Sequence, residues 1–242
     1  MSTKHDHIAD TLTGEVLSGR YQPGDRLPSE RELAVRFDAN RGAVREAMKK
    51  LAQLGIADIQ PGGARVAPIA EASLDIIGCM LASTDVPDAN LMNQIFEVVE
   101  RLLSMAAETV VERASDEQIE DIRKLVQLLC NGPLDREAHV QARMEMMRAF
   151  LVTSENLVCR LIAKSLFDQF APSMAALDQY FQLDVAAFSV FVRQLDRALA
   201  SRDRDAVRAI FDGITKLHRE TMMRAIEAAS QDSQNTTKVA AS

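Results

Sequence analysis

The stretch PSERELAVRFDANRGAVREAMKKL, residues 28–51, constrains the fold most because it has the pattern of two short helices joined by a tight turn. Ser29 and Glu32 form an S-x-x-E capping box, which marks the start of the first helix. Asn40 can cap the second helix, and Gly55 is placed to end it. The predicted helices span residues 29–37 and 41–54.

The residues on either side of this pair complete a small domain. Before it, residues 7–18 have apolar side chains on one helical face, and Pro23-Gly24 then marks a turn. After it, IADIQ-PGG-ARVAPI alternates apolar and polar residues around Pro-Gly-Gly, which is typical of a β-hairpin. The predicted order is helix, helix, helix, hairpin.

The second helix of the pair carries a basic stripe in a chain whose net charge is −7. At about 100° per residue its apolar residues share one arc, and Arg41, Arg45 and Lys49 lie outside it. Such a helix fits the major groove of DNA, where arginine can bind guanine and lysine suits phosphate. An ordinary solvated helix face gives the same stripe, but the surrounding order of elements favours DNA binding.

The segment GRYQPGDRLPSERELAVRFDANRGAVREAMKKLAQLGIADIQPGGARV resembles the winged helix-turn-helix of the GntR family of bacterial transcription regulators. The family's Pro-Gly turn and its L-P-S-E-R-E-L-A, R-x-x-V-R-E-A and L-x-x-x-G patterns are present almost residue for residue. The resemblance covers about residues 8–68 and is highly specific.

The resemblance implies that Arg31, Arg41 and Arg45 contact DNA. It also implies that the hairpin, called the wing, approaches the minor groove. Gly42 replaces the hydroxyl residue that often follows the first recognition arginine, so one base contact of the family is expected to be missing. Arg65 either helps in the wing or is a solvated strand residue. The expected DNA-binding residues are Arg31, Asn40, Arg41, Gly42, Arg45, Lys49, Gly62, Gly63 and Arg65.

The rest of the chain has the composition of a helical domain. Hydrophobic residues make up 47% of the sequence and aromatic residues 5%, and beyond Pro87 only Pro133 and Pro172 remain. The net charge is +1 over residues 1–68 and −8 over the remainder, which suggests two domains with different partners. Helices are expected at about 73–83, 89–113, 116–130, 134–152, 156–171, 173–181, 184–201 and 204–228.

These patterns predict a mainly α fold: a winged helix-turn-helix with three helices and a β-hairpin, followed by an all-α bundle. The expected divisions are a DNA-binding domain at 1–68, a linker or connecting helix at 69–84, an effector-binding and dimerisation domain at 85–229, and a disordered tail at 230–242.

Several classes of protein are not expected. The three cysteines form no CxxC pair, which suggests reduced thiols in a cytoplasmic protein, and no stretch has the length of a signal peptide or membrane span. No GxSxG, P-loop, Rossmann or HExxH motif is present, so an enzyme is not expected. Acidic residues at helical spacing, such as Glu97, Glu100, Glu108 and Glu112, are interpreted as solvated faces.

A helical domain of this length after a GntR-type winged helix-turn-helix domain resembles the FadR-type subfamily. Many members bind a divalent metal through a D-x-x-x-H pair, found before an S-G-N segment, and two later histidines. Aligned on Ser154-Glu155-Asn156 and on ALASRDRDAVRA, these four positions are Arg143, Met147, Val192 and Ile214. One is cationic and three are uncharged, so no metal and no cofactor are expected.

The fatty-acid-responsive protein that gives the subfamily its name also lacks the metal ligands, and MRAFLVTSENLVCRLIAKSLFDQF and ASLDIIGCMLA resemble its corresponding segments. An arginine that is common in the first long helix of related domains is Val99 here, with Arg101 two residues on, which argues against a small carboxylate ligand and for an apolar one. His218 has two interpretations: a histidine at the helix surface or lightly buried, or a polar group of a pocket. The methionines of the helical domain either fill the core or line that pocket. The expected ligand-binding residues are Met147, Val192, Ile214, His218, Met222 and Arg143.

The leading hypothesis is therefore a transcription regulator that binds a palindromic operator in double-stranded DNA as a homodimer. Its small-molecule effector is hypothesised to be a long-chain acyl-CoA, with Arg143 near the phosphates. The alternatives are a regulator that responds to another small metabolite, such as a carboxylic acid, and a ligand-independent DNA-binding protein.

Overall fold

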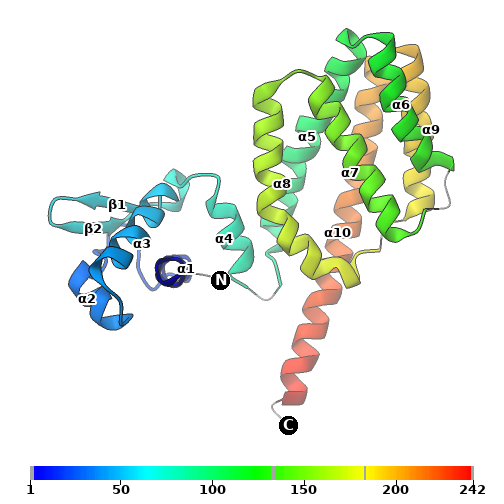
Figure 1. The fold of residues 1–242 in the computed structure, drawn as a ribbon. Coiled ribbons are helices and arrows are strands. Elements are labelled where there is room, and N and C mark those ends of the chain that lie inside the picture. Colours follow the sequence, from blue (N-terminus) through cyan, green and yellow to red (C-terminus); the bar gives the residue numbers. More distant parts are fainter. Residues whose placement is uncertain (1–2, 85, 132–133, 183, 241–242) are drawn as a thin grey trace. The chain divides into compact units, whose positions relative to one another are not determined.

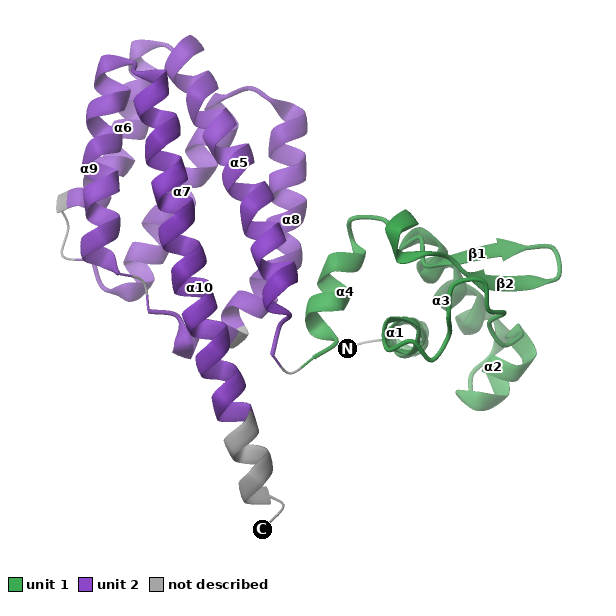
Figure 2. Cartoon of the chain, turned by 180° about the vertical axis from the view of Figure 1, so that it is seen from behind, with its two compact units in different colours: residues 1–85 green, residues 86–242 purple. Residues whose placement is uncertain are grey.

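A computed structural model describes residues 3–84, 86–131, 134–182 and 184–240. The chain forms two compact units, Met1–Asp85 and Val86–Ser242, which Figure 2 shows in different colours. The mainly α fold class expected from the sequence is confirmed, because the strands within the described residues form one two-stranded hairpin and the other elements are helices.

The first unit has the predicted order of elements (Figure 1). Each of its first three helices begins at a residue whose side chain accepts a hydrogen bond from the first turn: Thr3, Ser29 and Asn40. The capping box of Ser29 and Glu32 is confirmed. The elements are α1 Lys4–Leu17, α2 Glu30–Arg36, α3 Arg41–Gln53, β1 Ala57–Gln60, β2 Gly63–Val66, the 3₁₀ turn η1 Ile69–Glu71 and α4 Ile76–Ala82.

The core of this unit lies between α1 and α3. Leu12, Leu33 and Leu51 are fully buried there, one from each of the first three helices. The segment expected to be a linker at 69–84 belongs to the same unit, because Ile76 of α4 is buried in this core. The connecting helix α4 is therefore part of the first unit.

The β-hairpin pairs β1 with β2 in antiparallel register, from Ala57 opposite Val66 to Gln60 opposite Gly63. Its tip requires glycine, since φ is +103° at Gly62 and +134° at Gly63.

The second unit is a bundle of six helices in the described residues. Helix α5 packs against α7, α8 and α10, and α6 packs against α7 and α9 (Figure 1). Its elements are α5 Ala89–Arg113, α6 Asp116–Asn131, α7 Arg136–Thr153, α8 Leu157–Leu177, the 3₁₀ turn η2 Asp178–Tyr180, α9 Val185–Ser201 and α10 Arg204–Ala240.

The two helices expected at 156–171 and 173–181 are one continuous helix, α8, with Pro172 inside it. A proline inside a helix costs about 3 kcal/mol because it removes a hydrogen bond and crowds the preceding turn. Leu166, Phe170 and Leu177 are buried on one face of α8, on both sides of the proline. Packing along this face offsets the cost and keeps the helix in one piece.

The expected tail at 230–242 is a second correction, because α10 continues to Ala240 and only residues 241–242 of the tail lie outside the described residues. The sequence after Gly213 contains no glycine or proline, so nothing in it interrupts the helix.

No helix in the described ranges is long and apolar enough to cross a membrane. Cys79, Cys130 and Cys159 are all free thiols, and burial raises the pKa of each.

Candidate functional site

Helix α3 exposes the basic stripe and buries its other face. Val44, Ala47 and Leu51 lie in the core, whereas Arg41 and Arg45 are exposed. Asn40 fixes the start of the helix, since its Oδ1 accepts a hydrogen bond from the Ala43 amide at 2.8 Å. The first turn of α3 therefore presents arginine to solvent from a fixed backbone.

The basic residues differ in their protein contacts. Within the described residues, neither Arg31 nor Arg41 has a hydrogen bond or ion pair, so both guanidinium groups are available for an external anion. Arg45 Nε lies 2.8 Å from Glu30 Oε2, and Lys49 Nζ lies 2.8 Å from Glu46 Oε1. Such exposed pairs contribute only about 0–1 kcal/mol, so phosphates or bases can replace them at little cost.

Gly42 is exposed in the first turn of α3 and stands close to the cap. A Cβ at this position would lie 3.1 Å from Asn40 Oδ1, so a larger residue requires a small shift of the cap.

Arg26 lies outside the wing but supports it, and the sequence did not predict this role. Its guanidinium donates a hydrogen bond to the Gly62 carbonyl, and a Cβ on Gly63 would lie 3.0 Å from Arg26 Nε. Arg65 is exposed but donates to the Gly24 carbonyl at 2.7 Å, which ties the wing to the Pro23-Gly24 turn. The sequence places Arg26 directly after this turn, in GDRLP, but its β-bridge with Arg65 is a tertiary contact that appears only in the structure.

The helical unit contains a cavity of about 760 Å³. Residues from α5, α7, α8 and α10 line it, together with the segment around η2. Most of the lining is apolar, and its largest apolar members are Phe96, Met144, Met147, Phe167, Phe170, Met174 and Phe181. A cavity of this size lies within the range that binds small organic ligands.

The structure brings together some of the residues proposed for ligand binding. Arg143, Met147 and His218 line the cavity. Val192, Ile214 and Met222 are buried in the bundle and are absent from the lining, which corrects their expected position. Ile214, His218 and Met222 share one stripe of α10, but the cavity reaches that stripe only at His218.

A buried polar cluster borders the cavity and includes a glutamate interpreted from the sequence as solvated. Glu100 of α5 is 3% exposed and His218 of α10 is 6% exposed. His218 Nδ1 lies 2.7 Å from Glu100 Oε1, and His218 Nε2 lies 2.6 Å from Arg143 Nη2. The signal for burial was present in the sequence, because Phe96, Leu103 and Ala107 flank Glu100 on the same helical face.

The contacts fix the hydrogen positions of this cluster. A guanidinium only donates, so Nε2 of His218 accepts from Arg143 and the Nδ1–H donates to Glu100. Burial and the Arg143 charge lower the pKa of His218, which keeps the ring neutral. Burial lowers the pKa of Arg143 to about 10, and the Glu100 carboxylate opposes this shift, so the guanidinium is charged near neutral pH.

The buried histidines predict an acid-sensitive helical unit. The pKa values of His139 and His218 lie below the ordinary 6.5, so the unfolded chain takes up protons that the folded chain does not. Their contribution to stability is complete above pH 6.5 and is lost as the pH falls through the folded pKa values.

We expect the urea midpoint of this unit, followed by circular dichroism, to drop between pH 7 and about pH 5. His139→Phe should flatten the slope, whereas His7→Phe, at an exposed residue of α1, should not. A midpoint that stays constant over this range contradicts the assignment.

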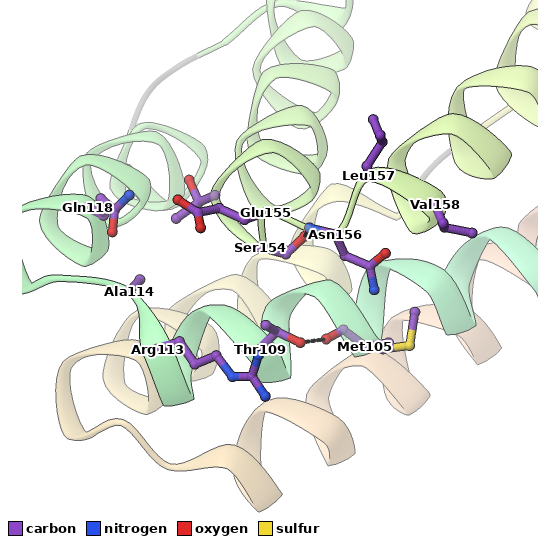
Figure 3. A pocket seen from close by; sticks show the side chains of 11 residues that line it. Met105, Thr109, Arg113, Ala114, Gln118, Ser154, Glu155, Asn156, Leu157 and Val158 are labelled. Carbon is purple, nitrogen blue, oxygen red and sulfur yellow. Dashed lines mark hydrogen bonds between the residues drawn. The ribbon is translucent and has the colours of Figure 1, made fainter.

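A second depression of about 610 Å³ lies at the surface between α5 and the junction of α7 and α8 (Figure 3). Ser154, Glu155 and Asn156, the segment used above to align the metal positions, line it. Met105 of α5 and Leu157 and Val158 of α8 border it, and all three are exposed large apolar side chains.

The four positions of the implied metal site do not suit a metal. Arg143 is a cation bound to His218, Met147 lines the cavity, and Val192 and Ile214 are buried apolar residues. In the part of the chain that the structure describes, no three His, Cys, Asp or Glu side chains gather in an arrangement that could hold a metal ion.

Two family models match the chain. Residues 4–66 match bacterial regulatory proteins of the gntR family, and residues 94–233 match the FCD domain. The first match covers the winged unit and the second covers most of the helical bundle.

Known proteins and solved structures agree with these matches. The HTH-type transcriptional regulator Mce2R of Mycobacterium tuberculosis is 25% identical over 224 residues, 90% of this chain and 91% of its own length. The galactonate operon transcriptional repressor of Escherichia coli is 27% identical over 164 residues, 66% of this chain and 71% of its own. The structure of Lar, described as controlling expression of the Listeria monocytogenes agr system, covers 94% of this chain and 98% of its own, with 18% identity and a TM-score of 0.55, and supports the fold alone.

Proposed function

Because the chain belongs to the GntR family of bacterial regulatory proteins and carries an FCD domain, we propose that it binds a palindromic operator as a homodimer under the control of a small ligand. The observation that carries this proposal is the exposed stripe of Arg41, Arg45 and Lys49 on a capped helix of an otherwise acidic chain. As a transcription regulator with three free thiols it would work in the cytoplasm.

The geometry of the first unit supports a specific set of proposed DNA contacts. Helix α3 enters the major groove with its N-terminal end nearest the bases, so Arg41 and Arg45 read base edges and Lys49 contacts phosphate. Arg31 adds a further contact from α2. The wing at Gly62 and Gly63 approaches the minor groove, and the hydrogen bond from Arg26 to the Gly62 carbonyl supports its tip. Arg65 supports the wing through its bond to Gly24.

A catalytic role is not proposed. The relatives named above are transcription regulators, and the sequence has none of the catalytic motifs that would favour an enzyme. Similarity to a repressor favours repression as the mode of action.

The proposed homodimer is supported by the surface of the helical unit. Val98, Met105, Leu157, Val158 and Leu161 are large apolar side chains that remain exposed on the neighbouring helices α5 and α8. Val98 and Met105 are two turns apart on one face of α5, and Leu157 and Leu161 are one turn apart on α8. Apolar patches of this kind mark protein interfaces, and a palindromic operator requires a second copy.

Val158→Glu is therefore expected to convert the dimer into a monomer of 26.7 kDa in light scattering. The charge would be buried without a partner in the interface, which is costly. Val190→Glu is the matched control, because Val190 is also an exposed valine but lies on α9, outside this patch. Val158 is 66% exposed and Val190 is 46% exposed. Monomer for the unchanged protein, or equal dissociation by both variants, contradicts this interface.

The ligand is proposed to occupy the cavity of about 760 Å³ in the helical unit. A long-chain acyl-CoA suits its apolar lining, at about 0.8 kcal/mol per buried CH₂ group. A carboxylic acid is the second candidate, favoured by the charged Arg143 at the cavity wall. Either ligand can act only if its affinities for the DNA-competent and DNA-incompetent states of the dimer differ. We propose that ligand binding moves the DNA-binding units of the two protomers apart.

Selection from a random DNA pool with the full chain tests the function. Two inverted half-sites, about one helical turn apart or a multiple of it, are the expected outcome. Recovery of DNA with no shared sequence would contradict an operator-binding regulator and leave only non-specific binding.

A further inference from the structure

The tip of the wing, Pro61-Gly62-Gly63, has no charged side chain and no side-chain hydrogen-bond donor. Within the hairpin the charged side chains are those of Asp58 and Arg65, so its net charge is zero. The Nη1 group of Arg65 donates to the Gly24 carbonyl at 2.7 Å, which holds this side chain at the Pro-Gly turn. A cation at the wing tip must therefore come from outside the hairpin.

Arg26 reaches the tip from a segment that is bound to β2. The amide of Leu27 donates to the Ala64 carbonyl at 2.9 Å, and Arg26 forms an antiparallel β-bridge with Arg65. Residues that lie opposite each other in paired strands point to the same face. Leu27 is buried, whereas both arginines are exposed. The backbone at Arg26 is therefore fixed, and its side chain lies on the exposed face of the hairpin.

The guanidinium of Arg26 fills the space that a side chain on Gly63 would take. It donates a hydrogen bond to the Gly62 carbonyl, and a Cβ on Gly63 would lie 3.0 Å from Nε and 3.2 Å from Nη2. A guanidinium has five N–H groups, and the described residues give Arg26 no other hydrogen-bond acceptor. Its remaining donors are therefore available to an external acceptor at the wing tip.

The charge of Arg26 has no ion-pair partner in the described part of the chain. The nearby carboxylates are engaged elsewhere. Asp58 accepts a hydrogen bond from Gln60. Glu32 accepts hydrogen bonds from the side chain and the amide of Ser29, which lower its pKa, and Arg26 adds only a smaller effect. Arg26 is thus a largely unneutralised cation beside a tip that has no charge of its own.

We propose that Arg26 is the cation through which the wing contacts DNA, and that its guanidinium enters the minor groove beside Gly62 and selects A·T base pairs there. This inference rests on the proposed function, because it names the residue and the base preference of the wing. The narrow minor groove of A·T-rich DNA has a strongly negative potential that attracts arginine. A G·C pair places the guanine amino group in that groove, and a guanidinium cannot accept a hydrogen bond from this donor.

Base-pair substitution in the operator selected by the full chain tests this contact. Each A·T pair is replaced in turn by G·C and by I·C, where the base of inosine is guanine without its amino group. An I·C pair therefore has the minor-groove surface of A·T and the major-groove surface of G·C. Where the wing lies, G·C should weaken binding about 5- to 50-fold in fluorescence anisotropy, whereas I·C should bind as A·T does.

Arg26→Met should bind the G·C and I·C operators equally at these positions. Arg65→Met is the matched control, because it removes the same charge from the same exposed face, and it should keep the difference between the two operators. Hydrogen exchange of the Leu27 amide, which donates to β2, shows whether the wing itself is intact. Its protection should be the same in Arg26→Met and in the unchanged protein.

The outcomes separate this inference from the proposed function. Equal binding of G·C and I·C at every position, a difference that survives in Arg26→Met, or equal losses in the two arginine variants would overturn the assignment. Loss of amide protection together with the loss of discrimination would also overturn it, since Arg26 would then only support the wing. In all of these cases the chain still selects an operator, so the proposed function stands. Failure to select any operator counts against the proposed function itself.

Discussion

Replacing Arg41 and Arg45 together by alanine should lower the affinity of the full chain for its selected operator by about 2–6 kcal/mol, since each arginine–base contact is worth roughly 1–3 kcal/mol. Arg41 is exposed and has no partner among the described residues, so its guanidinium is free for DNA. Arg45 must exchange Glu30 for DNA, but that exposed pair is weak.

Fluorescence anisotropy with operator and scrambled DNA measures this loss. The double variant should lose most of its preference for the operator, whereas Lys49→Ala should weaken binding to both DNAs equally. Lys50→Ala is the control for charge alone, because Lys50 is bound to Asp6 of α1 and does not belong to the stripe. Unchanged operator affinity in the double variant at moderate salt would show that α3 does not read the bases.

The second large effect is expected at Gly55, where Gly55→Ala should destabilise the first unit by about 2–4 kcal/mol. Gly55 has φ +73°, a conformation that alanine adopts with strain. An added Cβ would also lie 2.9 Å from Ala72 Cα and 3.1 Å from the Glu71 carbonyl oxygen. These are backbone atoms of the segment after the wing, so they cannot rotate away as a side chain would.

Urea unfolding of the first unit, followed by circular dichroism, measures the change. Gly14→Ala is the matched control, because Gly14 lies in the middle of α1 and a Cβ there would meet nothing within 4 Å. It should stabilise the unit by about 0.5–1 kcal/mol, so the two Gly→Ala changes have opposite signs. Equal effects of the two changes would contradict the close approach at Gly55.

The fold of the first unit could be predicted closely because local signals determine it. The caps at Ser29 and Asn40 and the glycines after α3 and at the wing tip each act through neighbouring residues. In the second unit, Pro172 led to a wrong prediction of a helix boundary. The buried face of α8 packs on both sides of the proline and keeps the helix continuous, and the rule that proline ends a helix does not take such packing into account.

The candidate sites could be predicted in part. The exposed basic stripe of α3 follows from helical spacing, whereas the support of the wing by Arg26 depends on a tertiary contact. In the cavity, alignment identified Arg143 but also selected Val192, which packs elsewhere. The role of Glu100 depends on helices α5, α7 and α10 meeting at one point, and only the three-dimensional structure gives that meeting.

The most direct test of a DNA-binding regulator is the salt dependence of binding to the selected operator and to a scrambled sequence of equal length. We expect tighter operator binding at every salt concentration, and a logarithm of affinity that falls steeply and linearly with the logarithm of salt concentration as counterions leave the phosphates. Equal affinity for both DNAs, or affinity that does not change with salt, would contradict the assignment of this chain as a sequence-specific DNA-binding regulator.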